Sequence, residues 1–343
     1  MNDSKPMEEQ TPDLIFTVEE CDSGQRLDGF VSRRGEGRSR VLVQTCIRDR
    51  LILVNGNPSR AAARLKAGDQ ISVAWPPEYE PKAEAEDIPL TILFEDDDII
   101  VINKQPGLVV HPNDNFKDGT LVNALIHHDP ETFTKMIDEN LRPGIVHRLD
   151  KDTSGALVIA KNLRARKALK AAFKSRDVEK TYLAIVIGEF GAVTGRVENL
   201  LGRHPVHRTK MAVVEENGKN AITNYRVLGT TEELSLMQIR IETGRTHQIR
   251  VHFAHLRHPV LGDDVYGGRQ KGISVDPPRQ MLHAWKLVIP HPVTGVKREF
   301  MAPPPEDFRA VLETAGLPMI SGPTPEEPDL TGLPVDDDAG CDA

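Results

Sequence analysis

Residues 142–160, RPGIVHRLDKDTSGALVIA, place a polar loop directly before an apolar run. The run at 156–160 is short and is preceded by turn residues, which is typical of a buried strand. Pro143 and Gly144 predict a turn at the start of the loop. Loops held by a rigid strand often carry catalytic groups, and this one is crowded with charged side chains. Catalysis by Asp150 is therefore one interpretation, and a charged surface turn with a routine ion pair is the other.

A second polar stretch, residues 242–255 (ETGRTHQIRVHFAH), predicts the end of a strand and the start of a helix. We expect Thr246 to cap this helix, because a threonine hydroxyl can accept a hydrogen bond from backbone N–H groups there. Ile249 and Phe253 follow at i, i+4 and should face the core. Arg245 precedes the helix N-terminus, where N–H groups and the helix dipole favour an anion. It is well placed to hold a phosphate or a carboxylate.

Around these stretches the pattern predicts an α+β fold, because strands come in successive runs and do not alternate regularly with helices. The sheet should be mixed, mostly antiparallel and flanked by helices. The predicted strands cover residues 99–103, 156–160, 181–187, 221–228 and 234–242, and the predicted helices cover 119–128, 163–176 and 246–256.

The preceding segment, residues 14–76, predicts a small α/β domain with two helices followed by strands. Asn55-Gly56 is a strong signal for a tight turn between strands. Arginines crowd the helical part, and the planar guanidinium can donate two parallel hydrogen bonds to a phosphate. We expect RNA contacts from Arg38, Arg40 and Arg48; a solvated, arginine-rich helix face is the alternative.

Three further segments set the domain boundaries. Residues 1–13 lack apolar periodicity and residues 317–343 are rich in Pro, Gly and Asp, so both should be disordered tails. Residues 77–89 combine prolines with charges and predict a linker. The main domain should therefore cover residues 90–316.

The formal net charge of −8 hides an uneven distribution. By simple counting, residues 1–13 carry about −3, residues 321–343 about −7 and residues 78–98 about −8, which leaves roughly +10 on the rest. The parts predicted to fold are therefore basic. Local basic patches fit an RNA partner, and a plain soluble enzyme is compatible with the same distribution.

The sequence argues against several other classes of protein. Its cysteines, Cys21, Cys46 and Cys341, are scattered and odd in number, which disfavours a disulfide framework and a CxxC zinc site. The apolar runs are too short to cross a bilayer. The polar, acidic N-terminus is unlike a signal or transit peptide. We therefore expect a cytoplasmic protein without membrane association, and a monomer by default.

The densest histidine cluster, His247, His252, His255 and His258, raises the alternative of a zinc hydrolase. The spacing disfavours it, because His247 and His252 are five residues apart and point away from each other on a helix. The sequence also lacks an HExxH motif. We expect no metal site.

HRLDKDTSG (147–155) and TGRTHQIRVHFAHLRHPVLGD (243–263) together resemble the RluA-type family of pseudouridine synthases. The family's other landmarks occur in the same order at 104–112, 180–186 and 281–292, so the resemblance covers nearly all of residues 90–305. The segment 14–76 resembles the S4-type RNA-binding domain. Within the family, the chain is most similar to the group that acts on large-subunit ribosomal RNA.

The resemblance assigns roles to single residues of the main domain. It implies that Asp150 is the essential catalytic aspartate and that Tyr182 packs on the target base. It implies that Arg245 pairs with the aspartate, and that Leu282 walls the base pocket. Arg148 becomes an RNA or structural contact. A basic insertion that grips RNA is implied as well, with contacts from Arg203, Arg208 and Lys210.

The chemistry agrees with an aspartate. The C1′–N1 bond of uridine must break and a C1′–C5 bond must form, so a carboxylate can attack the sugar or C6 of the base, or act as a base that promotes glycal formation. Each route needs an ionised carboxylate, which a nearby arginine favours. The nucleotide must be flipped out of its helix. We expect no cofactor, because no redox or phosphoryl step occurs.

The expected partner is ribosomal RNA of the large subunit or its precursor. Transfer RNA is an alternative substrate. A non-catalytic RNA-binding assembly factor is an alternative of another class, because the same basic surfaces would serve it.

Overall fold

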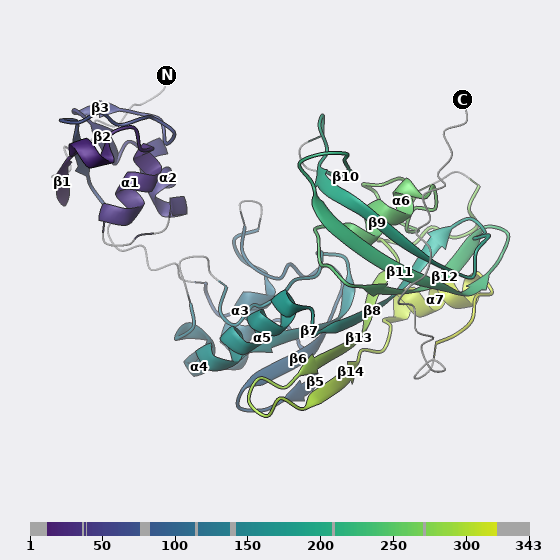
Figure 1. Ribbon diagram of the computed structural model, residues 1–343. Coiled ribbons are helices and arrows are strands. Elements are labelled where there is room, and N and C mark those ends of the chain that lie inside the picture. The colour runs from purple at the N-terminus through teal and green to yellow at the C-terminus, as the bar shows by residue number, and fades with distance from the viewer. Residues whose placement is uncertain are drawn as a thin grey trace, which may run out of the picture. The chain divides into compact units, whose positions relative to one another are not determined.

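The computed structural model describes residues 12–35, 38, 40–75, 83–113, 116–137, 142–207, 210–269 and 272–320. The chain separates into two compact units, an N-terminal unit of residues 1–82 and a C-terminal unit of residues 83–343 (Figure 1). Within the described ranges, every helix is too short or too polar to span a membrane.

The N-terminal unit packs two helices against a four-stranded antiparallel sheet with the order β1-β4-β2-β3. Its elements are β1 (Leu14–Thr17), η1 (Glu20–Asp22), α1 (Leu27–Arg34), α2 (Arg40–Arg48), β2 (Ile52–Val54), β3 (Asn57–Pro58) and β4 (Gln70–Val73). Asn55 and Gly56 join β2 to β3 with φ angles of 51° and 73°. Positive φ at both positions is what a tight type I′ hairpin turn requires, so the predicted turn is confirmed.

The C-terminal unit is built on a ten-stranded sheet. Its order is β10-β9-β11-β12-β8-β13-β7-β6-β5, and β14 pairs with β13 beside this path. The strands are β5 (Thr91–Glu95), β6 (Ile99–Lys104), β7 (Ser154–Ala160), β8 (Glu179–Ile187), β9 (Thr194–Arg203), β10 (Met211–Val213), β11 (Lys219–Thr230), β12 (Leu234–Ile241), β13 (Leu282–Pro290) and β14 (Lys297–Met301). Among these pairs only β13 and β7 run parallel, so the predicted mixed, mostly antiparallel sheet is confirmed.

Helices cover both faces of this sheet. They are α3 (Leu121–His128), α4 (Pro130–Thr134), α5 (Leu163–Ser175), α6 (Gln248–His255) and α7 (Glu306–Thr314). In β7, Leu157 packs in the cluster that contains Leu121 of α3, whereas Val158 packs in the cluster that contains Leu169 of α5. Because neither face of the strand is left in water, residues 156–160 form an uninterrupted apolar run.

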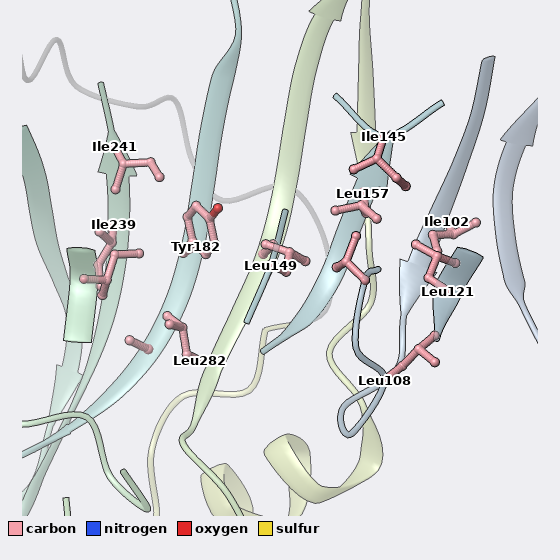
Figure 2. Packing of buried hydrophobic residues seen from close by; sticks show 14 of the residues in the cluster. Ile102, Leu108, Leu121, Ile145, Leu149, Leu157, Tyr182, Ile239, Ile241 and Leu282 are labelled. Carbon is pink, nitrogen blue, oxygen red and sulfur yellow. The ribbon is translucent and has the colours of Figure 1, made fainter. Parts of the chain in front are cut away.

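The same alternation in β8 turns Tyr182 toward the face that carries α3 and α6, and turns Leu183 toward Phe308 of α7. Figure 2 shows the tyrosine ring lying between Ile239 of β12 and Leu149, which belongs to the polar loop before β7. The strands β12, β8, β13 and β7 are neighbours at the centre of the sheet. Segments that are far apart in the sequence therefore meet there.

The C-terminal unit begins inside the segment predicted to be a linker. Ile88 packs against the main core. The Glu86 side chain accepts a hydrogen bond from the N–H of Gly119 at 2.8 Å, and Asn123 of α3 donates to the carbonyl of Glu84 at 2.8 Å. The boundary therefore lies at residue 83 and not at residue 90, because a composition rich in proline and charge does not reveal the few side chains that dock.

The predicted tails, residues 1–13 and 317–343, fall mostly outside the described residues. The structure describes the tail residues nearest the folded units, and these residues contact the units. Asp13 accepts a hydrogen bond from the N–H of Trp75 at 2.6 Å. Leu317, placed in the C-terminal tail from the sequence, is buried in the cluster that contains α7.

Gly155, at the start of β7, is a position where we expect substitution to be costly. Its φ is +118°, and an added Cβ would lie 2.1 Å from the carbonyl oxygen of Ala284 in β13. We expect Gly155→Ala to lower the free energy of unfolding by at least about 2 kcal/mol, through overpacking and backbone strain. Urea denaturation checks this, with Gly191→Ala as the matched control, because nothing lies within 4 Å of a Cβ there. Equal stability of the two variants would contradict the prediction.

Candidate active site

A hollow of about 110 Å³ opens beside Asp150, at the central strands of the sheet. Tyr182 of β8, Ile241 of β12 and Leu282 of β13 form its apolar wall, and Arg245 lines it as well. Tyr182 is 8% exposed and Leu282 is 4% exposed, so both side chains are almost completely buried. The structure therefore brings Asp150, Tyr182, Leu282 and Arg245 together, although they come from four separate segments.

A second hollow of about 310 Å³ meets the first at Asp150. Its lining is more polar and includes Arg148 and Lys151. Asp150 thus lies between a slot with apolar walls and a wider, more polar hollow lined by side chains of both charges, with 19% of its side chain exposed.

The carboxylate of Asp150 is held by Arg250 of α6. Nη1 of Arg250 donates to Oδ2 of Asp150 at 2.9 Å. The other side of the same guanidinium makes two bonds to Asp263, from Nε at 2.7 Å and from Nη2 at 3.0 Å. Asp263 is completely buried and Arg250 is 6% exposed. Burial lowers the pKa of Arg250, but the two carboxylates outweigh it, so the pKa is raised and the arginine stays charged.

The expectation that Arg245 pairs with Asp150 is therefore wrong. Arg245 donates from Nε to the carbonyl of Asn220 at 2.9 Å and remains in the wall of the hollow. Arg250, five residues further along the chain, makes the ion pair that the resemblance implied for Arg245. The two arginines flank the same helix N-terminus, and their order in the sequence does not tell which one points at the aspartate.

The start of α6 also differs from expectation. Its N-cap residue is His247, in the left-handed conformation with φ 57°, and not Thr246. The side chain of Gln248, the first residue of the helix, holds the preceding loop: its Oε1 accepts from the N–H of Arg245 at 3.0 Å and from the hydroxyl of Thr243 at 2.8 Å. Its Nε2 also donates two hydrogen bonds to β11, one to the carbonyl of Ile222 and one to the hydroxyl of Thr223, both at 2.9 Å.

Burial and then the neighbouring carboxylate of Asp150 raise the pKa of Tyr182. Its phenol therefore stays neutral at neutral pH and offers an aromatic face with a hydroxyl at one edge. An aromatic face and an apolar wall suit a planar base, because rings pack favourably face against face when offset.

The loop that carries Asp150 is fixed from beneath by two buried basic side chains, Lys104 and Arg279. Nζ of Lys104 donates to three carbonyls at 2.9 Å each, including that of Lys151. Arg279 donates to the carbonyl of Asp152 at 2.9 Å while it is paired with Asp307 of α7. The position of the carboxylate is thus set by the surrounding framework and not by the loop alone.

His147 lies beneath the same loop, away from the hollow. Its Nε2 accepts a hydrogen bond from the N–H of Val158 at 3.0 Å, and its ring stacks on Phe173 with a centroid separation of 4.6 Å. Burial, followed by the charge of Lys180, lowers its pKa to about 3. The neutral ring is a structural element of the fold.

The four clustered histidines do not converge on a common point. His252 is hydrogen-bonded to Thr223 and His258 to the carbonyl of Ile187. Within the described ranges, only two groups of three potential ligands lie close enough to hold a metal, and neither includes these histidines. The geometry gives no support to the zinc alternative.

The expected RNA contacts of the C-terminal unit are only partly described. Arg203 is exposed at the end of β9. Nζ of Lys210 donates to the carbonyl of Val265 at 2.8 Å. Arg208 lies outside the described residues. Arg148 is exposed beside Asp150, where a phosphate would be accessible to it.

In the N-terminal unit, Arg38 lies over the ring of Trp75 at 5.6 Å and Arg48 pairs with Asp49. Arg40 donates to the buried carboxylate of Asp28 at 3.0 Å. Hydrogen bonds, first of all from Arg26, lower the pKa of Asp28, so Arg40 has a structural role in addition to any RNA contact.

Two residues at the site were missed from the sequence, Arg250 and Asp263. A signal for each exists. Arg250 stands between two apolar residues on a helix whose neighbouring positions are buried, and Asp263 follows the apolar pair Val260 and Leu261. A charged residue inside a buried run is expected to have a buried partner of opposite charge.

Comparisons with known proteins agree with this geometry. The family model described as RNA pseudouridylate synthase matches residues 98–255, and the model described as S4 domain matches residues 25–71. "Ribosomal large subunit pseudouridine synthase D" of Vibrio parahaemolyticus is 44% identical over 88% of this chain and 94% of that protein. The protein of the same name from Escherichia coli K12 is 41% identical over 89% of this chain and 94% of its own length.

Among solved structures, "Human RNA Pseudouridylate Synthase Domain Containing 1" is 30% identical, with a TM-score of 0.53 over 65% of this chain and 87% of that one. The predicted resemblance is confirmed by sequence and by fold. With these similarities over most of its length, the chain belongs to the RNA pseudouridylate synthase family of isomerases and carries an S4 domain in its N-terminal unit.

Proposed function

We propose that Asp150 is the carboxylate that carries out the isomerisation, and that the hollow beside it holds the uracil ring. The observation that carries this proposal is the position of Asp150, which is paired with the buried Arg250 at the edge of a slot walled by Tyr182 and Leu282. A charged group whose geometry is fixed by buried partners, next to a cavity for its substrate, is a preorganised catalytic group.

The reaction needs three things from this site. A carboxylate must act at the sugar or at the base, and the hydrogen bond from the Arg250 guanidinium holds that of Asp150 in place. The detached uracil must stay in place while it turns, which a slot with apolar walls and one aromatic face permits. The nucleotide must leave its stacked helix, at a cost of a few kcal/mol.

The energy for extrusion comes from phosphate contacts on basic surfaces. In our proposal Arg148 and Arg245 hold the flipped nucleotide, while Arg203, Arg208 and Lys210 grip the RNA backbone. The S4 domain adds a second RNA-binding surface, with Arg38, Arg40 and Arg48 as its contacts. The protein works in this scheme as a cytoplasmic monomer without a cofactor.

We further propose that the substrate is ribosomal RNA of the large subunit. The relatives that share 41–44% of their residues with this chain are named for that subunit, and the similarity extends through the N-terminal unit. Transfer RNA is the alternative substrate.

Mapping pseudouridines in total RNA, from cells with and without the gene, tests the substrate. We expect specific pseudouridines of large-subunit ribosomal RNA to disappear without the gene and to return with a wild-type copy. In vitro, the purified full-length protein should modify a large-subunit transcript equally well in EDTA. Loss of pseudouridine from transfer RNA alone would contradict the proposed substrate, and loss of activity in EDTA would revive a metal site.

A further inference from the structure

His247 is a titratable group beside Asp150 that the scheme above does not use. Its Nε2 lies 3.9 Å from Oδ1 of Asp150, and the side chain is 22% exposed. The imidazole lines both hollows that meet at the aspartate. It is therefore in reach of any ring or sugar that Asp150 attacks.

The backbone of His247 is held in an unusual state. Its φ of 57° is in the left-handed region, which histidine adopts at a cost. Although it is the N-cap residue of α6, its side chain makes no capping hydrogen bond. Backbone strain of this kind persists where the surrounding structure enforces it, and such positions cluster at functional sites. Here the strain turns the imidazole away from the helix end and into the hollow.

Tyr266 fixes the orientation of the ring. Its hydroxyl lies 2.8 Å from Nδ1 of His247 and accepts a hydrogen bond from the N–H of Met211 at 2.9 Å. Its ring packs on the guanidinium of Arg250, 5.2 Å from the centroid. If Nδ1 carries the proton and donates to this hydroxyl, Nε2 presents a lone pair on the side that faces Asp150.

Every route from uridine to pseudouridine ends with the same proton transfer. Once C5 is bonded to C1′, it still carries its hydrogen. When that proton leaves, the C5–H electron pair becomes the C5=C6 double bond, the second pair of C6=N1 moves onto N1, and N1 takes up a proton. In the route through attack at C6, the lone pair of N1 first expels the carboxylate of Asp150 from C6, which forms the same C6=N1 double bond. Because C5 is then attached to C1′, the base that removes the proton must lie close to the carboxylate that works on the nucleotide.

The other polar groups around the hollow are poorly suited to this step. The pKa of Tyr182 is raised by burial and by Asp150, so its phenol is not ionised. Arg148, Arg245 and Arg250 remain protonated. The carboxylate of Asp150 accepts a hydrogen bond from Arg250 at 2.9 Å and, in the proposed scheme, already acts on the sugar or the base. Burial lowers the pKa of His247, so its ring is neutral at neutral pH and has a lone pair to offer.

We propose that His247 is a further catalytic residue: its Nε2 takes the proton from C5 of the newly attached base and returns it to N1, while Tyr266 acts as its positioning residue. This inference rests on the proposed role of Asp150 as the centre of the reaction. It holds for attack at the sugar, attack at the base or glycal formation, because all three leave the C5 proton to be removed.

The test uses His247→Gly in the full-length protein. Glycine adopts the left-handed φ of this position without strain, so the fold should be kept. With an in vitro transcript of large-subunit ribosomal RNA and excess enzyme, we expect the rate of pseudouridine formation to fall by about 10²–10⁴-fold. Added imidazole should restore part of the rate. Deuterium at C5 of the uridines should slow the variant much more than wild type, because proton removal has become rate-limiting.

Controls separate this role from a structural one. His255→Gln changes an exposed histidine of the same helix and should leave the rate unchanged. Tyr266→Phe keeps the imidazole but removes the hydroxyl that orients it. We expect a smaller loss of rate than in His247→Gly, with a similar isotope effect. The proposal is overturned if His247→Gly reacts at the wild-type rate, or if it is slow without an isotope effect and without rescue by imidazole. If wild-type protein leaves the transcript unmodified, the proposed substrate has failed and not the role of His247.

Discussion

Asp150→Asn should abolish pseudouridine formation while RNA binding stays nearly intact. We expect the single-turnover rate to fall by at least ~10⁴-fold, because an amide can act neither as nucleophile nor as base and removal of one essential group disables the whole unit. The affinity for a large-subunit transcript should change by less than about threefold, because phosphate contacts dominate it. The fold should persist, since Arg250 keeps its two bonds to Asp263.

Rates are measured by pseudouridine mapping of the transcript, and affinities by filter binding at fixed salt. Asp150→Ala serves as a second variant that cannot regain a carboxylate by deamidation. The matched control is Asp177→Asn, which changes a carboxylate in an exposed ion pair with Lys297, 3.0 Å away. Such surface pairs contribute little. If Asp150→Ala still converted uridine at a rate close to that of Asp177→Asn, the catalytic assignment would be wrong.

Arg250→Leu should damage both stability and activity. The substitution leaves Asp263 completely buried without its cation, so we expect the free energy of unfolding to fall by about 3–5 kcal/mol. It also frees the carboxylate of Asp150, and a misplaced catalytic group costs roughly 10²-fold or more in rate. Arg245→Leu should change stability by less than about 1 kcal/mol, because its side chain bonds only the carbonyl of Asn220 among the described contacts.

The double variant Arg250→Leu/Asp263→Asn separates the two effects. It removes both buried charges, and the amide oxygen at residue 263 can still accept the N–H groups of Val265 and Tyr266. We expect it to recover much of the lost stability, with a coupling energy of about 1–3 kcal/mol, and to remain as slow as Arg250→Leu. Urea unfolding followed by Trp285 fluorescence in a Trp75→Phe background reports on the C-terminal unit alone.

Two results would contradict this picture. If the double variant were less stable than Arg250→Leu, the buried charge of Asp263 would not be the source of the loss. If Arg245→Leu lost more activity and more stability than Arg250→Leu, Arg245 and not Arg250 would be the arginine that holds the aspartate.

The sequence alone determined the local features of this protein. The helix predicted from residue 163 begins there, and the side chain of the preceding Asn162 caps it by accepting from the N–H of Ala165 at 2.8 Å. The apolar run at 156–160 became a central strand, and Asn55-Gly56 became a tight turn. Each of these depends on residues a few positions apart, so the chain carries the whole signal within a short window.

Tertiary structure alone decided which charges meet. Asp150 and Arg250 are a hundred residues apart, and nothing in the spacing of Arg245 and Arg250 tells which guanidinium turns toward the carboxylate. That choice follows from the left-handed turn at His247 and from the buried Asp263, which fixes the far side of Arg250. The partner of a buried charge is set by how distant segments pack, because the free energy of its burial depends on every group that surrounds it.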